Sequence, residues 1–239
     1  DLHSFPTRRS SDLNAVASGY PLLDVFFDDS YIPQDVWKPQ SHRKKRIIWA
    51  PHHHMLEKNR CANFLFICDK MVELAKKYSE DVQFVFKPHP ELAKKLDTSV
   101  PGWNKERREH YYNLWETMPN TQVVTNDYID LFLTSDAIIH DCGSFTAEYL
   151  CTYKPMLFLE ANKGVIKGWN ECGKEIAKNI YLSNRGEKIE WFIDNVIIKE
   201  NDYMKEQRVN FVNDYLRPQD KEGASMAIYN YLKSELGLV

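Results

Sequence analysis

The sequence has few cysteines, and none stands in a spacing typical of a metal site. Five cysteines occur in 239 residues, at positions 61, 68, 142, 151 and 172, and no two of them form a CxxC pair. An odd number without regular spacing favours reduced thiols in a cytosolic setting. Cys142 lies in a polar turn, but no triad-like pattern surrounds it, so we interpret it as a structural thiol rather than a nucleophile.

The sequence also lacks a long apolar run and a strong charge of either sign. No stretch approaches the roughly 18–20 apolar residues that span a bilayer, so a membrane role would be peripheral or supplied by residues outside this chain. The 31 basic and 34 acidic residues give a net charge of −3. This near-balance gives no reason to expect nucleic acid as the main partner.

The N-terminal residues differ in composition from the rest of the chain. Residues 1–13, "DLHSFPTRRSSDL", carry two arginines and three serines but no apolar core of a secretory signal. They resemble a translated adapter or cloning sequence, so we expect them to be extraneous and the natural protein to begin well upstream. We expect residues 14–45 to be a linker that leads into the domain.

Short apolar segments alternate with amphipathic ones along the rest of the chain. Strands that are apolar throughout, separated by helices, indicate a parallel sheet covered on both faces. The sequence therefore predicts a doubly wound, Rossmann-like α/β domain over residues 46–239, with helices at its C-terminal end. The expected strands are 46–50, 82–86 (in the segment 82–90, where the strand stops at two prolines), 121–125, 136–141, 154–160 and 179–183. The expected helices are 61–78, 105–118, 127–135, 144–153, 170–178, 187–198, 203–216 and 222–236.

Polar clusters follow three of these strands: "APHHH" (50–54), "KPHP" (87–90) and "HDCGS" (140–144). Ligands of open parallel sheets bind beyond the carboxyl ends of the strands. Because the sheet brings these ends to one edge, we expect the three clusters to form one binding site.

The third cluster has the chemistry of an anion site. Gly143 lets the backbone approach a ligand, and Ser144 offers a hydroxyl and an N–H at the start of a helix, where a partial positive charge favours anions. The alternative is that Ser144 only caps its helix and Gly143 only permits the turn.

The second cluster adds positive charge. Lys87 supplies a point charge to a phosphate, and a protonated His89 supplies a second charge-assisted donor on a backbone fixed by two prolines. The alternative is a surface lysine beside a histidine with a local hydrogen bond.

The three histidines at 52–54 raise the question of a metal. Consecutive residues are not expected to point to one centre, and no HExxH or Cys/His zinc pattern is present, so we predict no metal ion. A ligand-facing His52 or His53 is the preferred interpretation, with solvated loop histidines as the alternative.

Five segments, in order, resemble the CDP-glycerol glycerophosphotransferases of teichoic-acid type, which are similar to GT-B glycosyltransferases. The long central segment is quite specific, whereas "KPHP" alone would be weak. The segments are "SGYPLLDVF" (18–26), "IIWAPHH" (47–53), "FVFKPHPEL" (84–92), 126–159 and "RPQDKEGASMAIYNYL" (217–232).

The resemblance implies the C-terminal, donor-binding half of a two-domain enzyme. An acceptor hydroxyl would attack the β-phosphorus of CDP-glycerol, with CMP leaving, and Lys87 and His89 would be the catalytic contacts to the pyrophosphate. Asp220 and the "GAS" turn (223–225) would close the nucleotide or glycerol pocket. The substrate-binding candidates are His52, His53, Asp141, Gly143, Ser144, Phe145, Thr146, Glu148, Asp220, Gly223 and Ser225.

The resemblance also implies which substrates the protein uses and where in the cell it works. It implies no cofactor, with CDP-glycerol or a similar CDP-alditol as donor substrate, a polymer or lipid-linked acceptor, and a cytoplasmic protein peripheral to the inner face of the cell membrane. The family usually has a serine pair where this chain has Cys142-Gly143-Ser144, so phosphate contacts would differ in detail.

The family's other half carries a His-Gly motif and the expected general base, but the chain contains no His-Gly dipeptide. We therefore expect the isolated chain to bind the donor weakly and to transfer little or nothing. Two other functions stay open: a GT-B glycosyltransferase or UDP-sugar epimerase-like enzyme, and a non-catalytic nucleotide-binding module of polysaccharide biosynthesis.

Overall fold

A parallel sheet of six strands organises the part of the chain that the computed structural model describes, namely residues 18–56, 61–126, 128–162, 164–218 and 222–237. The strand order is β3-β2-β1-β4-β5-β6, and all five pairings are parallel. This is the order of the doubly wound nucleotide-binding fold, in which the winding reverses between β1 and β4. The predicted fold class is confirmed. The strands are β1 (Lys45–Ala50), β2 (Val82–Phe86), β3 (Thr121–Val123), β4 (Ala137–His140), β5 (Met156–Glu160) and β6 (Tyr181–Asn184).

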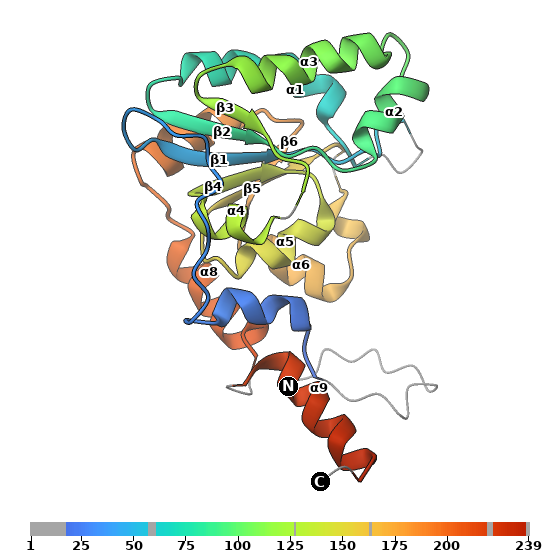
Figure 1. Ribbon diagram of the computed structural model, residues 1–239, viewed down its shortest axis with the longest axis vertical. Coiled ribbons are helices and arrows are strands. Elements are labelled where there is room, and N and C mark those ends of the chain that lie inside the picture. Colours follow the sequence, from blue (N-terminus) through green and yellow to red (C-terminus); the bar gives the residue numbers. More distant parts are fainter. Residues whose placement is uncertain (1–17, 57–60, 127, 163, 219–221, 238–239) are drawn as a thin grey trace.

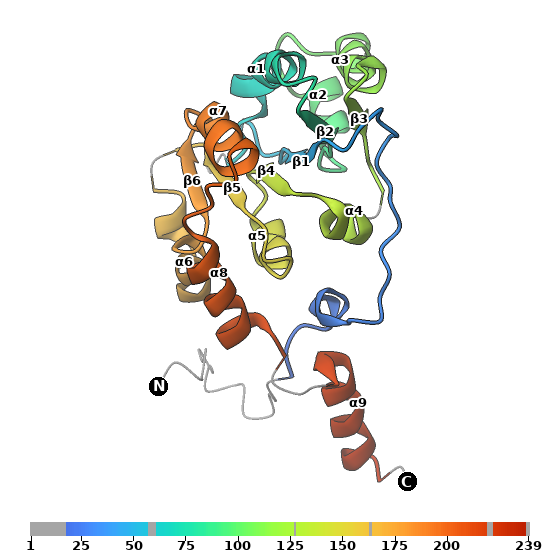
Figure 2. The same ribbon diagram turned by 90° about the vertical axis from the view of Figure 1, so that its left-hand side faces the viewer.

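Helices cover both faces of the sheet (Figures 1 and 2). One face carries α1 (Phe64–Lys77), α2 (Leu92–Thr98), α3 (Lys105–Thr117) and α7 (Ile189–Trp191), which continues into the π-helical η3 (Phe192–Ile198). The opposite face carries α4 (Ile129–Thr134), α5 (Gly143–Leu150), α6 (Glu171–Ala177) and α8 (Lys205–Phe211), which continues into the π-helical η4 (Val212–Leu216). The 3₁₀ helices are η1 (Pro21–Phe27) and η2 (Ile166–Gly168), and α9 (Gly223–Glu235) extends away from the sheet.

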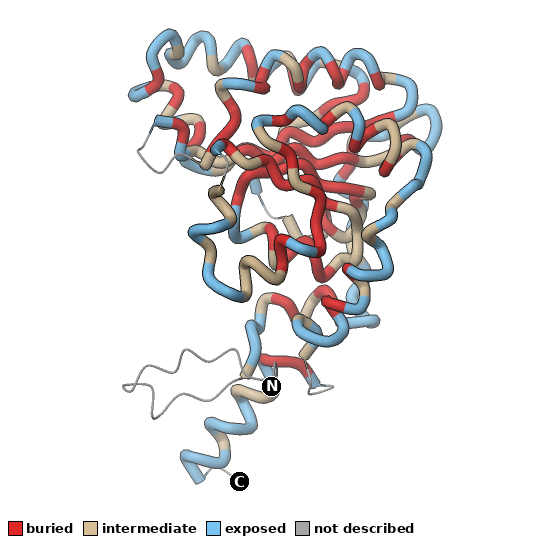
Figure 3. Tube along the Cα trace, turned by 180° about the vertical axis from the view of Figure 1, so that it is seen from behind, coloured by how far each residue is buried: buried red, intermediate tan, exposed pale blue. Residues whose placement is uncertain are grey.

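The central strands are buried on both faces because their apolar side chains alternate between two cores. In β1, Ile47 and Trp49 pack under α1 and α3, whereas Ile48 and Ala50 pack against the helices of the other face. Figure 3 shows the strands as an almost continuous buried layer, with the exposed residues in the outer helices, the loops and α9. This burial explains why the strands read as apolar runs.

Helix α2 departs from the sequence expectations, whereas β2 and α4 agree with them. Helix α2 was not expected, because its segment is polar and buries only Leu92 and Leu96, spaced four residues apart. Strand β2 ends at Phe86, as expected, because Pro88 and Pro90 have no N–H to donate to a sheet ladder. Expected helix 127–135 is observed as α4, and the first residue of the expected range, Asp127, lies outside the described residues.

The segment expected to be a linker contributes to the core. Leu23, Phe26 and Trp37 are buried with the helices of the α4 and α5 face, so these residues pack as part of the domain. The expected extraneous segment 1–13 lies outside the described residues. Within the described part of the chain, no helix combines the length and apolar character needed to cross a bilayer.

Candidate functional site

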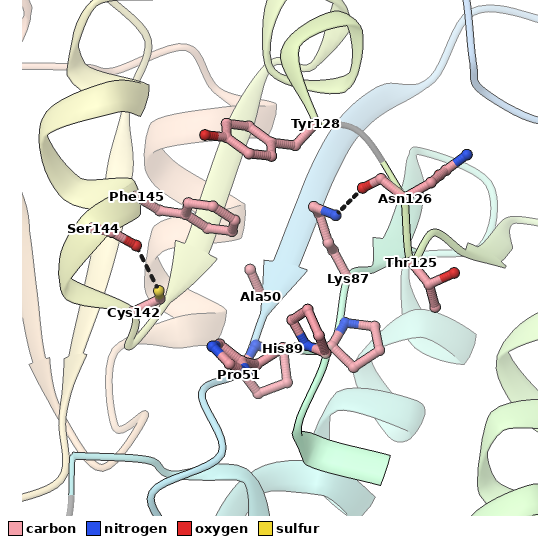
Figure 4. A pocket seen from close by; sticks show the side chains of 12 residues that line it. Ala50, Pro51, Lys87, His89, Thr125, Asn126, Tyr128, Cys142, Ser144 and Phe145 are labelled. Atoms are coloured by element: carbon pink, nitrogen blue, oxygen red, sulfur yellow. Dashed lines mark hydrogen bonds between the residues drawn. The ribbon is translucent and has the colours of Figure 1, made fainter. Parts of the chain in front are cut away.

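A cavity of about 370 Å³ opens at the carboxyl edge of the sheet, beside the point where the winding reverses (Figure 4). All three polar clusters predicted from the sequence reach it, together with the loop after β3. Its volume is within the range of small-ligand sites. The lining residues are Ala50, Pro51, Lys87, Pro88, His89, Pro90, Thr125, Asn126, Tyr128, Cys142, Ser144 and Phe145.

Lys87 places a buried cation in the wall of this cavity. Its side chain is 6% exposed, so the alternative of a surface lysine is wrong. The ammonium donates to the carbonyl of Asn126 at 2.7 Å and lies 5.8 Å from the centre of the Tyr128 ring. An ammonium has three N–H donors, and Lys87 holds these donors in the wall of the cavity. Lys87 can therefore donate to an anionic ligand in the cavity.

His89 is half-buried on the same wall, and its loop is fixed to the end of β1. Its backbone N–H donates to the carbonyl of Pro51 at 3.1 Å, and its Nδ1 accepts the N–H of Glu91 at 3.1 Å. Burial lowers the pKa of His89 from its usual value, Glu91 partly opposes this, and His54 adds to it. Burial therefore disfavours the protonated His89 that the sequence analysis expects. In the neutral ring the proton is on Nε2, which makes that atom a donor.

The start of α5 forms the opposite wall. Its N-cap is Cys142, which makes no side-chain capping bond, so the expected alternative in which Ser144 only caps the helix is not observed. The Ser144 hydroxyl lies 3.2 Å from the Cys142 sulfur. Gly143 does not have positive φ, and a Cβ at this position would meet nothing within 4 Å. The turn itself does not need glycine, and the space beside it is open.

Asp141 is placed differently from the expected ligand contact. It is 2% exposed and does not line the cavity. Its carboxylate accepts the backbone N–H of His52 and of Asn63, each at 2.6 Å, and the Asn63 side chain at 3.2 Å. Burial raises the pKa of Asp141 to about 7, while these donors favour the ionised form. Asp141 thus ties the loop after β1 to the turn between β4 and α5. Its direct contact with a donor substrate stays a prediction.

Three further candidates lie on α5. Phe145 lines the cavity. Thr146 is buried and is not among the lining residues, and its hydroxyl donates to the carbonyl of Cys142 at 3.3 Å. Glu148 is buried next to Tyr128; burial raises the pKa of Glu148, and Tyr128 partly offsets the shift. Of the three, only Phe145 borders the cavity.

The "GAS" turn is not part of this cavity, contrary to expectation. Gly223 lines a separate cavity of about 790 Å³ between η1 and α9. The N–H groups of Ala224 and Ser225 donate to the carboxylate of Asp24, each at 2.8 Å. The start of α9 is therefore already capped from the other end of the chain. Asp220 lies outside the described residues.

The loop after β3 was missed by the sequence interpretation. Thr125, Asn126 and Tyr128 line the cavity, and Asn126 holds the Lys87 ammonium. The signal was available, because this loop also follows a strand of a parallel sheet. It carries no charged cluster of its own, so the pattern that marked the other three strand ends was absent.

The three consecutive histidines lie close together, although the sequence predicted that they would not. One ring nitrogen from each of His52, His53 and His54 lies within 4.8 Å of the others. The ring of His53 is 4.0 Å from that of His89. His53 also lines a small neighbouring cavity of about 200 Å³, whereas His52 lines neither cavity.

Comparison of the sequence with protein-family models shows which family the chain belongs to. The family model described as CDP-Glycerol:Poly(glycerophosphate) glycerophosphotransferase matches residues 5–233. The chain belongs to this family. The predicted resemblance is thereby confirmed, and it covers all four loops of the cavity. No curated protein matches the chain in sequence.

Solved structures support the fold of this family member. The structure of the wall teichoic acid polymerase TagF is 18% identical, has a TM-score of 0.52, and is matched over 91% of this chain and 48% of that chain. The UDP-GlcNAc 2-epimerase from Neisseria meningitidis, bound to UDP-GlcNAc, is 20% identical with a TM-score of 0.46, over 83% of this chain and 45% of that chain. The chain spans about half the length of these proteins. The likeness to TagF confirms the GT-B-like fold.

Proposed function

We propose that this member of the glycerophosphotransferase family binds a CDP-activated alditol phosphate, CDP-glycerol in the first instance, with the donor diphosphate in the cavity between Lys87 and the start of α5. The observation that carries the proposal is that the buried Lys87 and the start of α5, which has no side-chain cap, line the same open cavity from different sides (Figure 4). A cation and a helix N-terminus on opposite walls suit a ligand with two phosphates.

Each wall contributes a different kind of contact. Lys87 supplies charge, the Nε2–H of neutral His89 supplies a directed hydrogen bond, and Ser144 supplies its hydroxyl and the amides of the helix start. Hydrogen bonds to charged groups contribute about 1.5–3 kcal/mol each. The ring of Tyr128 and that of Phe145 line the same cavity and provide apolar surface for the nucleoside or glycerol part.

The proposed reaction is transfer of glycerol phosphate to an acceptor hydroxyl. The acceptor oxygen forms a bond to the β-phosphorus, the bond from that phosphorus to the bridging oxygen breaks, and CMP leaves with the electron pair. Lys87 and His89 stabilise the negative charge that develops on the bridging oxygen, since donors aimed at such charge each lower a barrier by about 2.7–4 kcal/mol. The acceptor proton passes to a general base, which we place in the half of the protein that this chain does not span.

The acceptor and location follow as parts of the same proposal. A polymer or lipid-linked hydroxyl of the cell envelope is the acceptor, as in teichoic acid synthesis, and the protein works at the inner face of the membrane through peripheral contact. Donor binding needs neither a metal nor a cofactor in this scheme.

The proposal is tested by donor binding to Lys87→Met. Loss of one charged contact is expected to weaken CDP-glycerol binding by roughly 10- to 100-fold, measured by calorimetry on the 239-residue chain. Lys154→Met is the matched control, because Lys154 is a mostly buried lysine whose ammonium donates to the carbonyls of Phe132 and Leu133 outside the cavity. Equal CDP-glycerol affinity in wild type and Lys87→Met would refute the proposed phosphate site.

Donor competition distinguishes the proposal from the epimerase-like alternative. CDP-glycerol is expected to protect the loops at 87–90 and 142–145 from hydrogen exchange at concentrations where UDP-GlcNAc does not. Protection by UDP-GlcNAc alone would favour a nucleotide-sugar enzyme of the same fold.

A further inference from the structure

Four histidine rings gather beside the proposed phosphate site. The ring centres of His52 and His53 are 4.3 Å apart, those of His53 and His54 are 4.2 Å apart, and those of His52 and His54 are 4.7 Å apart. His89 packs against His53 at 4.0 Å. Rings this close bring one nitrogen of each of His52, His53 and His54 into one small volume.

The backbone explains how three consecutive side chains reach the same side. In an extended strand, neighbouring side chains point to opposite faces, but here the chain turns sharply after Pro51. The N–H of Met55 donates to the carbonyl of His53 at 3.0 Å, and the N–H of Ala62 donates to that of His54 at 3.1 Å. The N–H of His54 in turn donates to Nδ1 of His52 at 3.2 Å. The turn, rather than the sequence spacing, brings the rings together.

The base of this turn is held from the core of the domain. The backbone N–H of His52 donates to the buried carboxylate of Asp141 at 2.6 Å, and the same carboxylate holds Asn63 at the start of α1. A loop fixed at its base presents its side chains in a defined arrangement, which lowers the conformational entropy lost when a ligand binds. His52 and His53 are half-buried and His54 is exposed, so the cluster is open to solvent on one side.

We propose that His52, His53 and His54 bind a divalent transition-metal ion of the zinc class, independently of the proposed donor site. Their ligand nitrogens lie within 4.8 Å of one another, and a tetrahedral zinc site with bonds of about 2.0–2.1 Å places its nitrogens about 3.4 Å apart. Small rotations of the rings close this difference. The fourth position is open to water.

The donor atoms decide the class of metal. Imidazole nitrogens suit zinc, copper, nickel and cobalt, whereas magnesium and calcium need oxygen ligands, which these three side chains do not provide. The sulfur of Cys61 lies 3.4 Å from Nδ1 of His52, so a soft donor also borders the cluster. Among these metals, zinc has no geometric preference of its own, so it tolerates a site built from adjacent residues.

The proposal is tested by zinc titration of the full 239-residue chain, prepared without a polyhistidine tag and in the absence of nucleotide. Competition with a chelating dye is expected to show one zinc ion per wild-type chain. His53→Ala and His54→Ala each remove a direct ligand. Loss of a residue that only hydrogen-bonds to a metal ligand lowers metal affinity by roughly 10- to 100-fold. Loss of a ligand itself should weaken zinc binding by at least as much.

His110→Ala is the matched control, because His110 is an exposed histidine on α3 outside the cluster. It is expected to bind zinc like the wild type. Zinc should raise the melting temperature of the wild type and of His110→Ala but not of His54→Ala, since only a ligand of the folded state stabilises it. Cobalt bound to the wild type should show the visible absorption of a tetrahedral site.

Two outcomes would overturn the site. One is a wild-type chain that binds zinc no more tightly than the triple variant His52→Ala/His53→Ala/His54→Ala. The other is an equal loss of zinc affinity in His110→Ala and His54→Ala. Neither outcome bears on the Lys87 test of CDP-glycerol binding, because zinc is titrated without nucleotide.

Discussion

At position 143 the chain has a glycine that its own backbone does not need. A Cβ there would meet nothing within 4 Å, and its φ is not positive. Gly143→Ala should therefore leave the free energy of unfolding unchanged or slightly higher, because alanine favours a helix over glycine by up to about 1 kcal/mol. The methyl group would occupy the space where a phosphate approaches α5, so we expect CDP-glycerol affinity to fall about tenfold or more.

Gly168→Ala is the control for this variant. Gly168 lies on η2, also without neighbours at a Cβ position and without positive φ, but outside the cavity. It should change neither donor binding nor stability appreciably, as measured by calorimetry and denaturant titration. Unchanged donor affinity in Gly143→Ala would show that the ligand does not approach the start of α5.

At the residue scale, His140 makes the free energy of unfolding depend on pH. It is fully buried at the end of β4, with Nδ1 3.0 Å from the carbonyl of Cys142 and Nε2 3.0 Å from the sulfur of Met156. Burial lowers the pKa of His140 to about 4, partly offset by the bond to Cys142. Because the unfolded histidine titrates near 6.5, the stability that neutral His140 contributes is present above pH 6.5 and is lost as the pH falls toward 4.

The measurable quantity is the difference in unfolding free energy between wild type and His140→Asn. Proton linkage predicts that the unfolding free energy of the wild type, relative to that of His140→Asn, falls by about 2 kcal/mol between pH 7.5 and pH 5. Denaturant titrations at both values test this, with all other titrating groups common to the two proteins. A difference that stays constant with pH would contradict a neutral, buried His140.

At the scale of elements, α9 depends on a residue two hundred positions away in the chain. Asp24 on η1 accepts the N–H groups of Ala224 and Ser225, and the positive φ of Gly223 (+85°) lets the chain pass directly beside the Asp24 carboxylate. Asp24→Ala should lower the stability of this junction by roughly 0.5–2 kcal/mol, as loss of an N-cap does. We expect faster hydrogen exchange in α9, with the sheet unaffected.

Asp28→Ala serves as the comparison, because Asp28 bonds only locally to Ser30 beyond the end of η1. In Asp28→Ala, the rate of hydrogen exchange in α9 should match that of the wild type. If Asp24→Ala also leaves α9 exchange unchanged, the helix is held by its packing on η1 rather than by the carboxylate.

The predictability of elements follows how many apolar contacts each one makes. Helix α1 was expected at nearly its observed bounds because seven of its residues are buried at helical spacing. Helix α2 was missed because Leu92 and Leu96 alone are buried, and two apolar residues do not define a period. The π-helical continuations η3 and η4 lay inside helices that were expected, since apolar periodicity does not report a change in hydrogen-bonding pattern.

At the scale of the whole molecule, the strand order decides where the chemistry gathers. Placing β4 beside β1 brings the start of α5 next to the loops after β1 and β2, although these segments are far apart in sequence. The chain nevertheless spans about half the length of the solved proteins it matches. We therefore expect the isolated chain to bind CDP-glycerol but to transfer glycerol phosphate at a rate close to the uncatalysed one.

A radiolabel transfer assay with a polyol-phosphate acceptor tests this expectation, with calorimetric CDP-glycerol binding as the check that the chain is folded and competent. Rapid transfer by the 239 residues alone would mean that they contain the general base. Binding without transfer would agree with a base supplied by the remainder of the protein.

The sequence by itself determined the sheet, its two covered faces and the three polar strand ends, because each depends on residues that are neighbours in the chain or repeat with a fixed period. Only the tertiary structure decided that Asp141 ties two loops together, that Asp24 caps α9, and that three consecutive histidines share one side of a turn. These arrangements arise from contacts between distant segments and from a local reversal of the backbone. Neither leaves a periodic signal in the order of the residues.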